Sequence, residues 1–199
     1  MKKSTIDRSH NTAKIIVASL LPLLATVVNA KEYLGLKLSE ESAKVHAKLK
    51  KDSATFSVDY GYKGHKELPM TKIRYYRRFS KYGRIKKGWL HFTPKQKLYK
   101  ISVSWADNGK TYKLFRDALD SKYGAAKSYG RGMGFTNVYH YIDGLVSIKL
   151  SRNTFGFGDD QTTSLEYVYT PALSDVADME NKIKQSIKRK NAKKAVNDL

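Results

Sequence analysis

The chain has 199 residues, with 38 Lys and Arg against 18 Asp and Glu and no cysteine. This composition excludes disulfides, a thiol nucleophile and a thiolate metal site, and the net charge of +20 favours acidic partners. The length is sufficient for one domain with a hydrophobic core even after removal of a leader.

Residues 1–30 are typical of a cleaved secretory signal peptide. A basic start precedes the apolar run IIVASLLPLLATVV at 15–28, which is too short to cross a hydrocarbon core of roughly 30 Å. Val28 and Ala30 are small residues that suit a signal-peptidase site. A buried helix or an uncleaved anchor is the alternative. We expect a periplasmic or secreted mature chain that begins near Lys31 and has no transmembrane segment.

The positive charge survives this processing. The leader holds four of the 38 basic residues and one of the 18 acidic residues, so the mature chain keeps an excess of 17 positive charges. Such a chain is attracted to lipopolysaccharide phosphates, anionic lipid, nucleic acid or an acidic protein. High positive charge also occurs in proteins that have no dedicated anionic ligand. Because a lipoprotein needs a cysteine at the cleavage point to carry its lipid, the chain cannot be a lipoprotein.

The mature chain opens with a helix predicted over roughly 39–50. Ser39 is a candidate N-cap, and Val45 and Leu49 lie one turn apart on one face. Four strands are predicted next, separated by glycine and proline, in the segments ATFSVDYGY, MTKIRYYRR, GWLHF and LYKISVSW.

A second helix is predicted in TYKLFRDALDSKYG, with Thr111 as its cap and Gly124 just past its end. The following segment, AAKSYGRGMGFTN, is predicted to be a loop. The hairpin NVYHYIDGLVSIKL turns at Asp143-Gly144, a favoured two-residue turn that places His140 opposite Ser147. SLEYVYT is the last strand. One face of the hairpin is predicted core and comprises Tyr139, Tyr141, Val146, Ile148 and Leu150.

This order predicts the α+β class, with an antiparallel meander sheet or sheets and helices packed on one face. We expect a single domain over 31–173, whose candidate halves, 31–106 and 107–173, suggest a duplicated helix-plus-strands unit. The order is similar, in architecture alone, to small exported bacterial proteins such as secreted enzyme inhibitors and envelope-assembly factors.

Residues 174–199 are predicted to form a basic C-terminal helix. Val176, Met179, Ile183 and Ile187 form its apolar stripe. One interpretation is a basic amphipathic helix on a membrane surface or polyanion. The other, favoured because the stripe is thin, is a helix docked on the domain with its last ten residues frayed. The candidate anionic-surface residues are Lys182, Lys184, Lys188, Arg189, Lys190, Lys193 and Lys194.

No catalytic, metal or cofactor motif is present. YGRGMGF lacks the glycine spacing of a dinucleotide site and precedes a strand, so a loop is favoured. The histidines lack ligand spacing, and we expect no metal and no cofactor. A hydrolase remains an alternative only if the fold brings together at least two of His91, His140, Asp159 and Asp160.

The segment KIRYYRRFSKYGRIKKGW, residues 72–89, has the composition of a polyanion-binding site. Strand alternation separates its aromatic residues from most of its cations, which disfavours base stacking and hence nucleic acid. The outward-facing residues then form a predicted partner-binding face, comprising Lys72, Arg74, Tyr76 and Arg78.

The sequence therefore predicts an exported, non-enzymatic binding protein, of the kind of an inhibitor or an envelope accessory factor, that uses a basic sheet face against an acidic partner. Direct adhesion to lipopolysaccharide or lipid through the C-terminal helix, as a peripheral membrane contact, is the first alternative. The hydrolase is the second.

Overall fold

The computed structural model describes residues 31–60, 66–107, 109–132 and 135–197, so the predicted signal peptide lies outside the described residues. The elements follow one another in the order β1 (Glu32–Tyr33), β2 (Leu36–Lys37), α1 (Ser42–Lys51), β3 (Thr55–Asp59), β4 (Met70–Tyr75), α2 (Arg77–Ser80), β5 (Ile85–Phe92), β6 (Leu98–Ala106), α3 (Lys110–Tyr123), β7 (Ser128–Gly132), β8 (Thr136–Asp143), β9 (Val146–Asn153), η2 (Gly158–Asp160), β10 (Thr162–Tyr169), η3 (Thr170–Ala172) and α4 (Leu173–Asn197).

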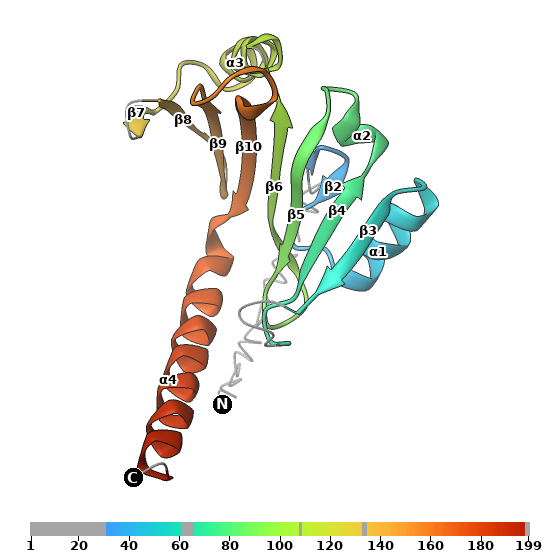
Figure 1. Ribbon diagram of the computed structural model, residues 1–199. Coiled ribbons are helices and arrows are strands. Elements are labelled where there is room, and N and C mark those ends of the chain that lie inside the picture. The colour runs from blue at the N-terminus through green and yellow to red at the C-terminus, as the bar shows by residue number, and fades with distance from the viewer. Residues whose placement is uncertain (1–30, 61–65, 108, 133–134, 198–199) are drawn as a thin grey trace, which may run out of the picture.

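Strands β3 to β10 form one antiparallel sheet in the order β3-β4-β5-β6-β10-β9-β8-β7. The chain runs through β3 to β6 as a meander, crosses by α3 to the opposite edge, and returns through β7 to β10 (Figure 1). The two meanders meet where β10 pairs with β6. The α+β class with an antiparallel sheet is therefore confirmed. Each meander follows a helix, and the internal duplication stays a prediction.

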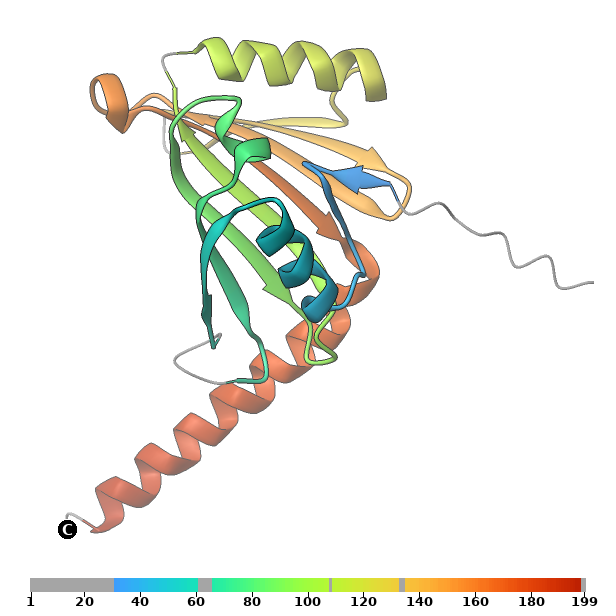
Figure 2. The same cartoon turned by 90° about the vertical axis from the view of Figure 1, so that its right-hand side faces the viewer.

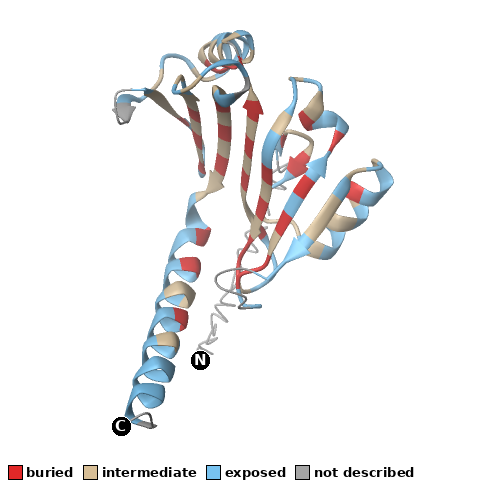
Figure 3. Ribbon diagram, viewed as in Figure 1, coloured by how far each residue is buried: buried red, intermediate tan, exposed pale blue. Residues whose placement is uncertain are grey.

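Helices α1, α2 and α3 and the β1–β2 hairpin pack on one face of the sheet, which we call the inner face (Figure 2). Buried and less buried residues alternate along the strands (Figure 3), as expected for a sheet with one covered face. The predicted core of the β8–β9 hairpin is confirmed, since four of its residues are buried and Tyr139 packs against them. The opposite, outer face carries the polar half of this alternation.

The predicted Asp143-Gly144 turn is wrong by one residue. Asp143 pairs with Val146, so the turn residues are Gly144 and Leu145. Gly144 has a φ of +59°, which a glycine adopts without steric cost. The pairing is displaced by two residues, and a displacement of two leaves each side chain on its predicted face. His140 therefore remains on the outer face.

Both predicted N-caps are wrong, whereas Gly124 lies at the end of α3 as predicted. Ser39 has a φ of +66°, and α1 instead begins at Ser42 with Glu41 in the N-cap position. At α3 the cap is a side chain from before the helix, because the Asp107 carboxylate accepts the N–H of Thr111 at 2.9 Å. This hydrogen bond between Asp107 and Thr111 fixes the connection between β6 and α3, which leads into the second meander.

The predicted loop between α3 and the hairpin contains the edge strand β7, which pairs with β8 over Ser128–Gly132. Its sequence, SYGRG, is rich in glycine, which is depleted in strands and favoured in loops. Pairing along an existing strand compensates for this weak local preference. The second half of the domain thus has four strands where the sequence predicts three.

The C-terminal helix α4 leaves the end of β10 and points away from the sheet (Figure 1). Val176 and Ile183 are buried against Leu68, and Tyr99 of β6 packs on the same cluster. The predicted docking of the apolar stripe is confirmed. The helix continues to Asn197, where we expected the last ten residues to fray.

Candidate functional site

The predicted basic face is formed only in part. Lys72 and Arg74 lie on β4 with exposed side chains. Tyr76, in contrast, is 0% exposed and belongs to the core. Arg78 lies on α2, on the inner side of the sheet. The placement of Tyr76 and Arg78 on the outer face is therefore wrong, and the partner-binding residues do not share one surface.

An irregularity at the end of β4 explains this error. Tyr75 and Ile73 pair with adjacent residues of β3, so β4 contains one extra residue between them. A bulge of this kind changes which residues of a strand face the core. Tyr75 is consequently 47% exposed, and Tyr76 turns inward, where its ring lies 4.9 Å from that of Phe79. Regular alternation therefore ends at Tyr75, before the predicted outward residues Tyr76 and Arg78.

Tyr76 and Arg78 have structural partners. The Tyr76 hydroxyl donates to Asp52 at 3.1 Å, and Arg78 Nε donates to the same carboxylate at 3.4 Å. Burial, followed by this hydrogen bond, raises the pKa of Tyr76 well above its ordinary value, so the hydroxyl stays protonated. Both side chains therefore connect α2 to the end of α1.

The outer face has a regular order across the sheet. One residue from each strand pairs with the next to form a continuous row, which we call the outer row. In the spatial order of the strands it comprises Ser57, Lys72, Trp89, Ser102, Glu166, Lys149, His140 and Ser128. A second row beside it places Ser104, Ser164 and Ser151 on adjacent strands. The middle of the outer face is thus lined by small hydroxyl residues.

The charge of the outer face is mainly positive. Lys72 Nζ lies 5.6 Å from the centre of the Trp89 ring, within the range of a cation–π interaction. Glu166 pairs with Lys100 at 2.7 Å, so this acid is already neutralised. Other cations whose strand positions place them on the same face are Arg74, Lys87 and Lys149.

The residues proposed for a hydrolase site occupy three separate places in the fold, on β5, on β8 and in η2. His91 and His140 lie on β5 and β8, which are four strand positions apart, or about 19 Å. His91 pairs with Lys100 near one end of β6, whereas η2, with Asp159 and Asp160, packs near the other end. Over the described ranges, no group of three or more His, Asp or Glu is placed to hold a metal. The convergence on which the hydrolase alternative depends is not found.

The seven cations of α4 are all exposed: Lys182, Lys184, Lys188, Arg189, Lys190, Lys193 and Lys194. Lys190 and Lys194 follow Ile183 and Ile187 by seven residues, which places them on the same side of the helix as the docked stripe. The docked apolar stripe therefore ends at Ile187, and the distal part of α4 is mostly polar, with Val196 exposed near its end. None of the helices in the described part of the chain is long and apolar enough to cross a membrane.

Trp89 is the main site residue that the sequence analysis missed. The segment GWLHF contains the signal, because Gly88, Leu90 and Phe92 alternate with Trp89 and His91. Since Leu90 and Phe92 are buried on the inner face, Trp89 must face outward beside Lys72. The predicted strand GWLHF is confirmed as part of β5, and Trp89 is one of its outward residues.

The chain matches no protein-family model, no curated protein and no solved structure. Its function is therefore inferred from the geometry of these surfaces.

Proposed function

We propose that the protein is an exported, non-enzymatic binding protein that presents the outer sheet face to an acidic partner, in the manner of an inhibitor or an envelope accessory factor. The observation that carries this proposal is the outer row, in which Trp89 lies between Lys72 on β4 and serine side chains on β6 and β10. Export rests on the predicted signal peptide.

Several features favour contact with a partner over a merely solvated face. Helices α1, α2 and α3 all pack on the inner face, which leaves the outer face accessible beyond the end where α4 docks. Small side chains such as Ser102, Ser104 and Ser164 let a partner approach the sheet closely. Strand residues are held in place by the hydrogen bonds of the sheet, so a surface of this kind needs little ordering on binding, which lowers the entropic cost of association.

Trp89 is the expected anchor of the interface. Tryptophan and arginine are enriched among the residues that dominate binding energy, and surrounding polar residues exclude water from them. Trp89 is partly buried by its neighbours, and Lys72 lies over its ring. Acidic side chains of a partner would pair with Lys72 and Arg74 near this ring and with Lys149 three strands away along the outer row.

The alternative of direct adhesion through α4 has one supporting feature, the exposed cations of its distal part. Two measurements separate the proposals: capture of an acidic protein from envelope extract, and binding to anionic phospholipid vesicles.

With the outer face as the site, the charge-reversal pair Lys72→Glu/Arg74→Glu should abolish capture of the acidic protein. The matched pair Lys193→Glu/Lys194→Glu changes net charge equally on α4 and should leave capture intact.

The affinity for the captured partner should fall about 100-fold in the outer-face pair and about tenfold or more in Trp89→Ala, measured by calorimetry. Equal loss in both charge-reversal pairs would mean that net charge alone attracts the partner. If only the α4 pair loses binding, and anionic phospholipid vesicles also bind through α4, the outer-face proposal is wrong.

A further inference from the structure

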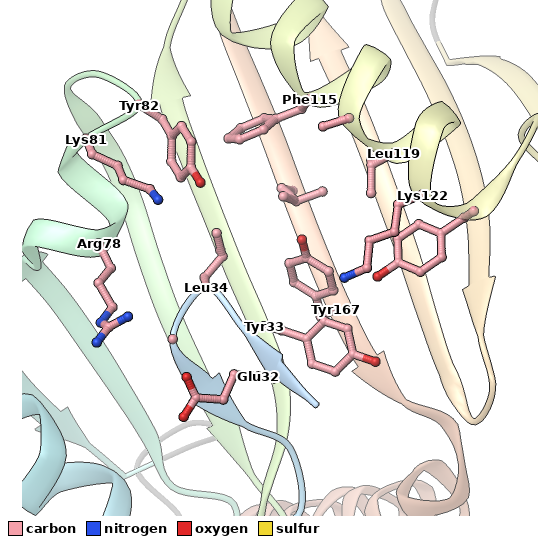
Figure 4. A pocket seen from close by; sticks show the side chains of 14 residues that line it. Glu32, Tyr33, Leu34, Arg78, Lys81, Tyr82, Phe115, Leu119, Lys122 and Tyr167 are labelled. Atoms are coloured by element: carbon pink, nitrogen blue, oxygen red, sulfur yellow. The ribbon is translucent and has the colours of Figure 1, made fainter. Parts of the chain in front are cut away.

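A cavity of about 320 Å³ lies on the inner side of the molecule, on the opposite face of the sheet from the outer row. The β1–β2 hairpin, the end of α2, α3 and strand β10 surround it (Figure 4). Its size falls at the lower end of the roughly 300–1,000 Å³ typical of small-molecule sites. The cavity is thus large enough for a small organic compound and too small for a protein segment with several side chains.

The walls of the cavity are aromatic. Tyr33 and Tyr167 lie 4.8 Å apart at their ring centres, and Tyr82 and Phe115 lie 4.7 Å apart. Leu34 adds an aliphatic contact from the β1–β2 hairpin. Aromatic faces and edges arranged around a cavity favour a flat apolar body.

Tyr167 supplies a hydrogen-bonding group without a protein partner. Its side chain belongs to β10 and the residue is 8% exposed, yet its hydroxyl bonds to no residue in the described part of the chain. Figure 4 shows this hydroxyl pointing into the cavity. The neighbouring hydroxyls of Tyr33 and Tyr123 both donate to Asp143. Among the described residues, the Tyr167 hydroxyl is not one of the buried polar atoms that lack a partner, so it is accessible from the cavity and can donate to a ligand atom.

Two lysines give the cavity a positive mouth. Figure 4 shows the ammonium groups of Lys81 and Lys122 directed toward the cavity from opposite sides, the first from the end of α2 and the second from α3. Each lies near a tyrosine ring, at 4.8 Å and 5.1 Å from its centre, and has no carboxylate partner among the described residues. The rim acid Glu32 is already paired with Lys48 at 2.8 Å. The uncompensated charge at the mouth is therefore positive.

We propose that this cavity binds a small aromatic carboxylate. The carboxylate pairs with the Lys81 or the Lys122 ammonium group at the mouth, the flat body packs between the aromatic walls, and the Tyr167 hydroxyl donates to an oxygen of the ligand. A compound without the negative charge leaves both lysines uncompensated, and a long flexible chain does not fit the aromatic walls.

The cavity is preorganised by the contacts of the β1–β2 hairpin. Tyr33 is fixed by its hydrogen bond to Asp143 at 2.9 Å, and Glu32 is fixed by Lys48. Because these bonds link the hairpin both to the β8–β9 turn and to α1, the wall that it forms is positioned before a ligand arrives. Preorganisation of this kind raises affinity by reducing the ordering that binding requires.

The test uses cinnamate as the probe, with cinnamamide as its neutral analogue and octanoate as an aliphatic acid of similar charge. Calorimetry and ligand-observed NMR on the mature chain should show saturable 1:1 binding of cinnamate, at least about tenfold tighter than either analogue. Lys81→Gln/Lys122→Gln should weaken binding about tenfold or more, and Tyr167→Phe about fivefold. The pair Lys193→Gln/Lys194→Gln removes the same charge from α4 and should bind as the wild type does.

Circular dichroism and thermal unfolding verify that each variant is folded. Equal binding of cinnamamide, tighter binding of octanoate, wild-type affinity in the pocket variants, or no saturable binding below about 5 mM would each overturn the proposal. The outer-face variant Lys72→Glu/Arg74→Glu should bind cinnamate normally, so failure of this site and failure of the proposed function are distinguishable.

Discussion

The Asp143→Asn substitution is expected to destabilise the protein substantially, because one carboxylate holds three parts of the chain together. Asp143 Oδ1 accepts from Lys31 at 2.6 Å, and Oδ2 accepts the hydroxyls of Tyr33 at 2.9 Å and Tyr123 at 3.1 Å. These partners come from the start of the described chain, β1 and the end of α3. The Asp143 side chain is only 10% exposed, so water does not readily replace the lost bonds.

The magnitude follows from the three contacts. The Lys31 side chain is 60% exposed, and an ion pair of that exposure contributes about 0.5 kcal/mol. Hydrogen bonds from partly buried tyrosines to a carboxylate contribute about 1.5 kcal/mol each or somewhat less. An asparagine keeps one acceptor oxygen. Its amide group replaces the other oxygen by an N–H donor, which then faces a lysine or tyrosine that is itself a donor. We expect a loss of about 2–3 kcal/mol in the free energy of unfolding, measured by urea denaturation near pH 7.

The control is Asp117→Asn, which breaks an exposed pair with Lys113 on α3 and should cost less than about 0.5 kcal/mol. Burial, the largest influence, would raise the pKa of Asp143, but the bonds from Lys31, Tyr33 and Tyr123 outweigh it and lower the pKa. The contribution is therefore present above about pH 4 and is lost as the pH falls through the lowered pKa. A cost for Asp143→Asn equal to that of the control, or a difference from wild type that persists at about pH 2, would refute this reasoning.

The other predictions concern α3, the histidine on β5 and α4. Asp107→Asn should lower the free energy of unfolding by about 2 kcal/mol, because the Asp107 carboxylate accepts the N–H of Thr111 at 2.9 Å and the hydroxyl of Thr163 at 2.6 Å. Slower amide hydrogen exchange at the first turn of α3 in the variant would contradict this. Burial, aided by a nearby lysine, lowers the pKa of His91 to about 4, so the unfolded chain binds a proton that the folded chain does not. Stability should fall by about 2 kcal/mol between pH 7 and pH 5, and His91→Gln should flatten that slope. Ile183→Asp should release α4 from the domain and lower the melting temperature measured by thermal unfolding. An aspartate substituted at an exposed position in the distal half of α4 should change the melting temperature little.

Most of the fold was predictable from residue periodicity. The longer strands, α3 and α4 have apolar residues at regular spacing, and the β8–β9 hairpin kept its predicted core face although its turn was assigned one residue early. The weaker elements were missed for a physical reason. Strands β1 and β2 have only two residues each and pair with each other, and edge strand β7 pairs with the neighbouring β8 through a glycine-rich sequence, so none of the three has the alternating apolar pattern of a longer strand.

The candidate site was less predictable because one irregular residue decides it. Up to Arg74, simple alternation places β4 correctly, but the bulge near Tyr75 turns Tyr76 inward and the chain then enters α2. A bulge depends on the partner strand and has no clear sequence signal. The cavity on the inner side was also invisible, since Tyr33, Lys81 and Tyr167 are far apart in sequence and meet only in the fold.

Four of the acids serve the fold of the domain. The carboxylates of Asp52, Asp107, Asp120 and Asp143 each accept hydrogen bonds from side-chain hydroxyls within the domain. Acids of this kind stabilise the fold and cannot neutralise distant lysines on the exposed faces. Replacing them should therefore be costly, whereas replacing cations such as Lys72 should change stability little. Because the fold does not require these surface cations, loss of binding in a stable Lys72 variant can be assigned to the interface itself.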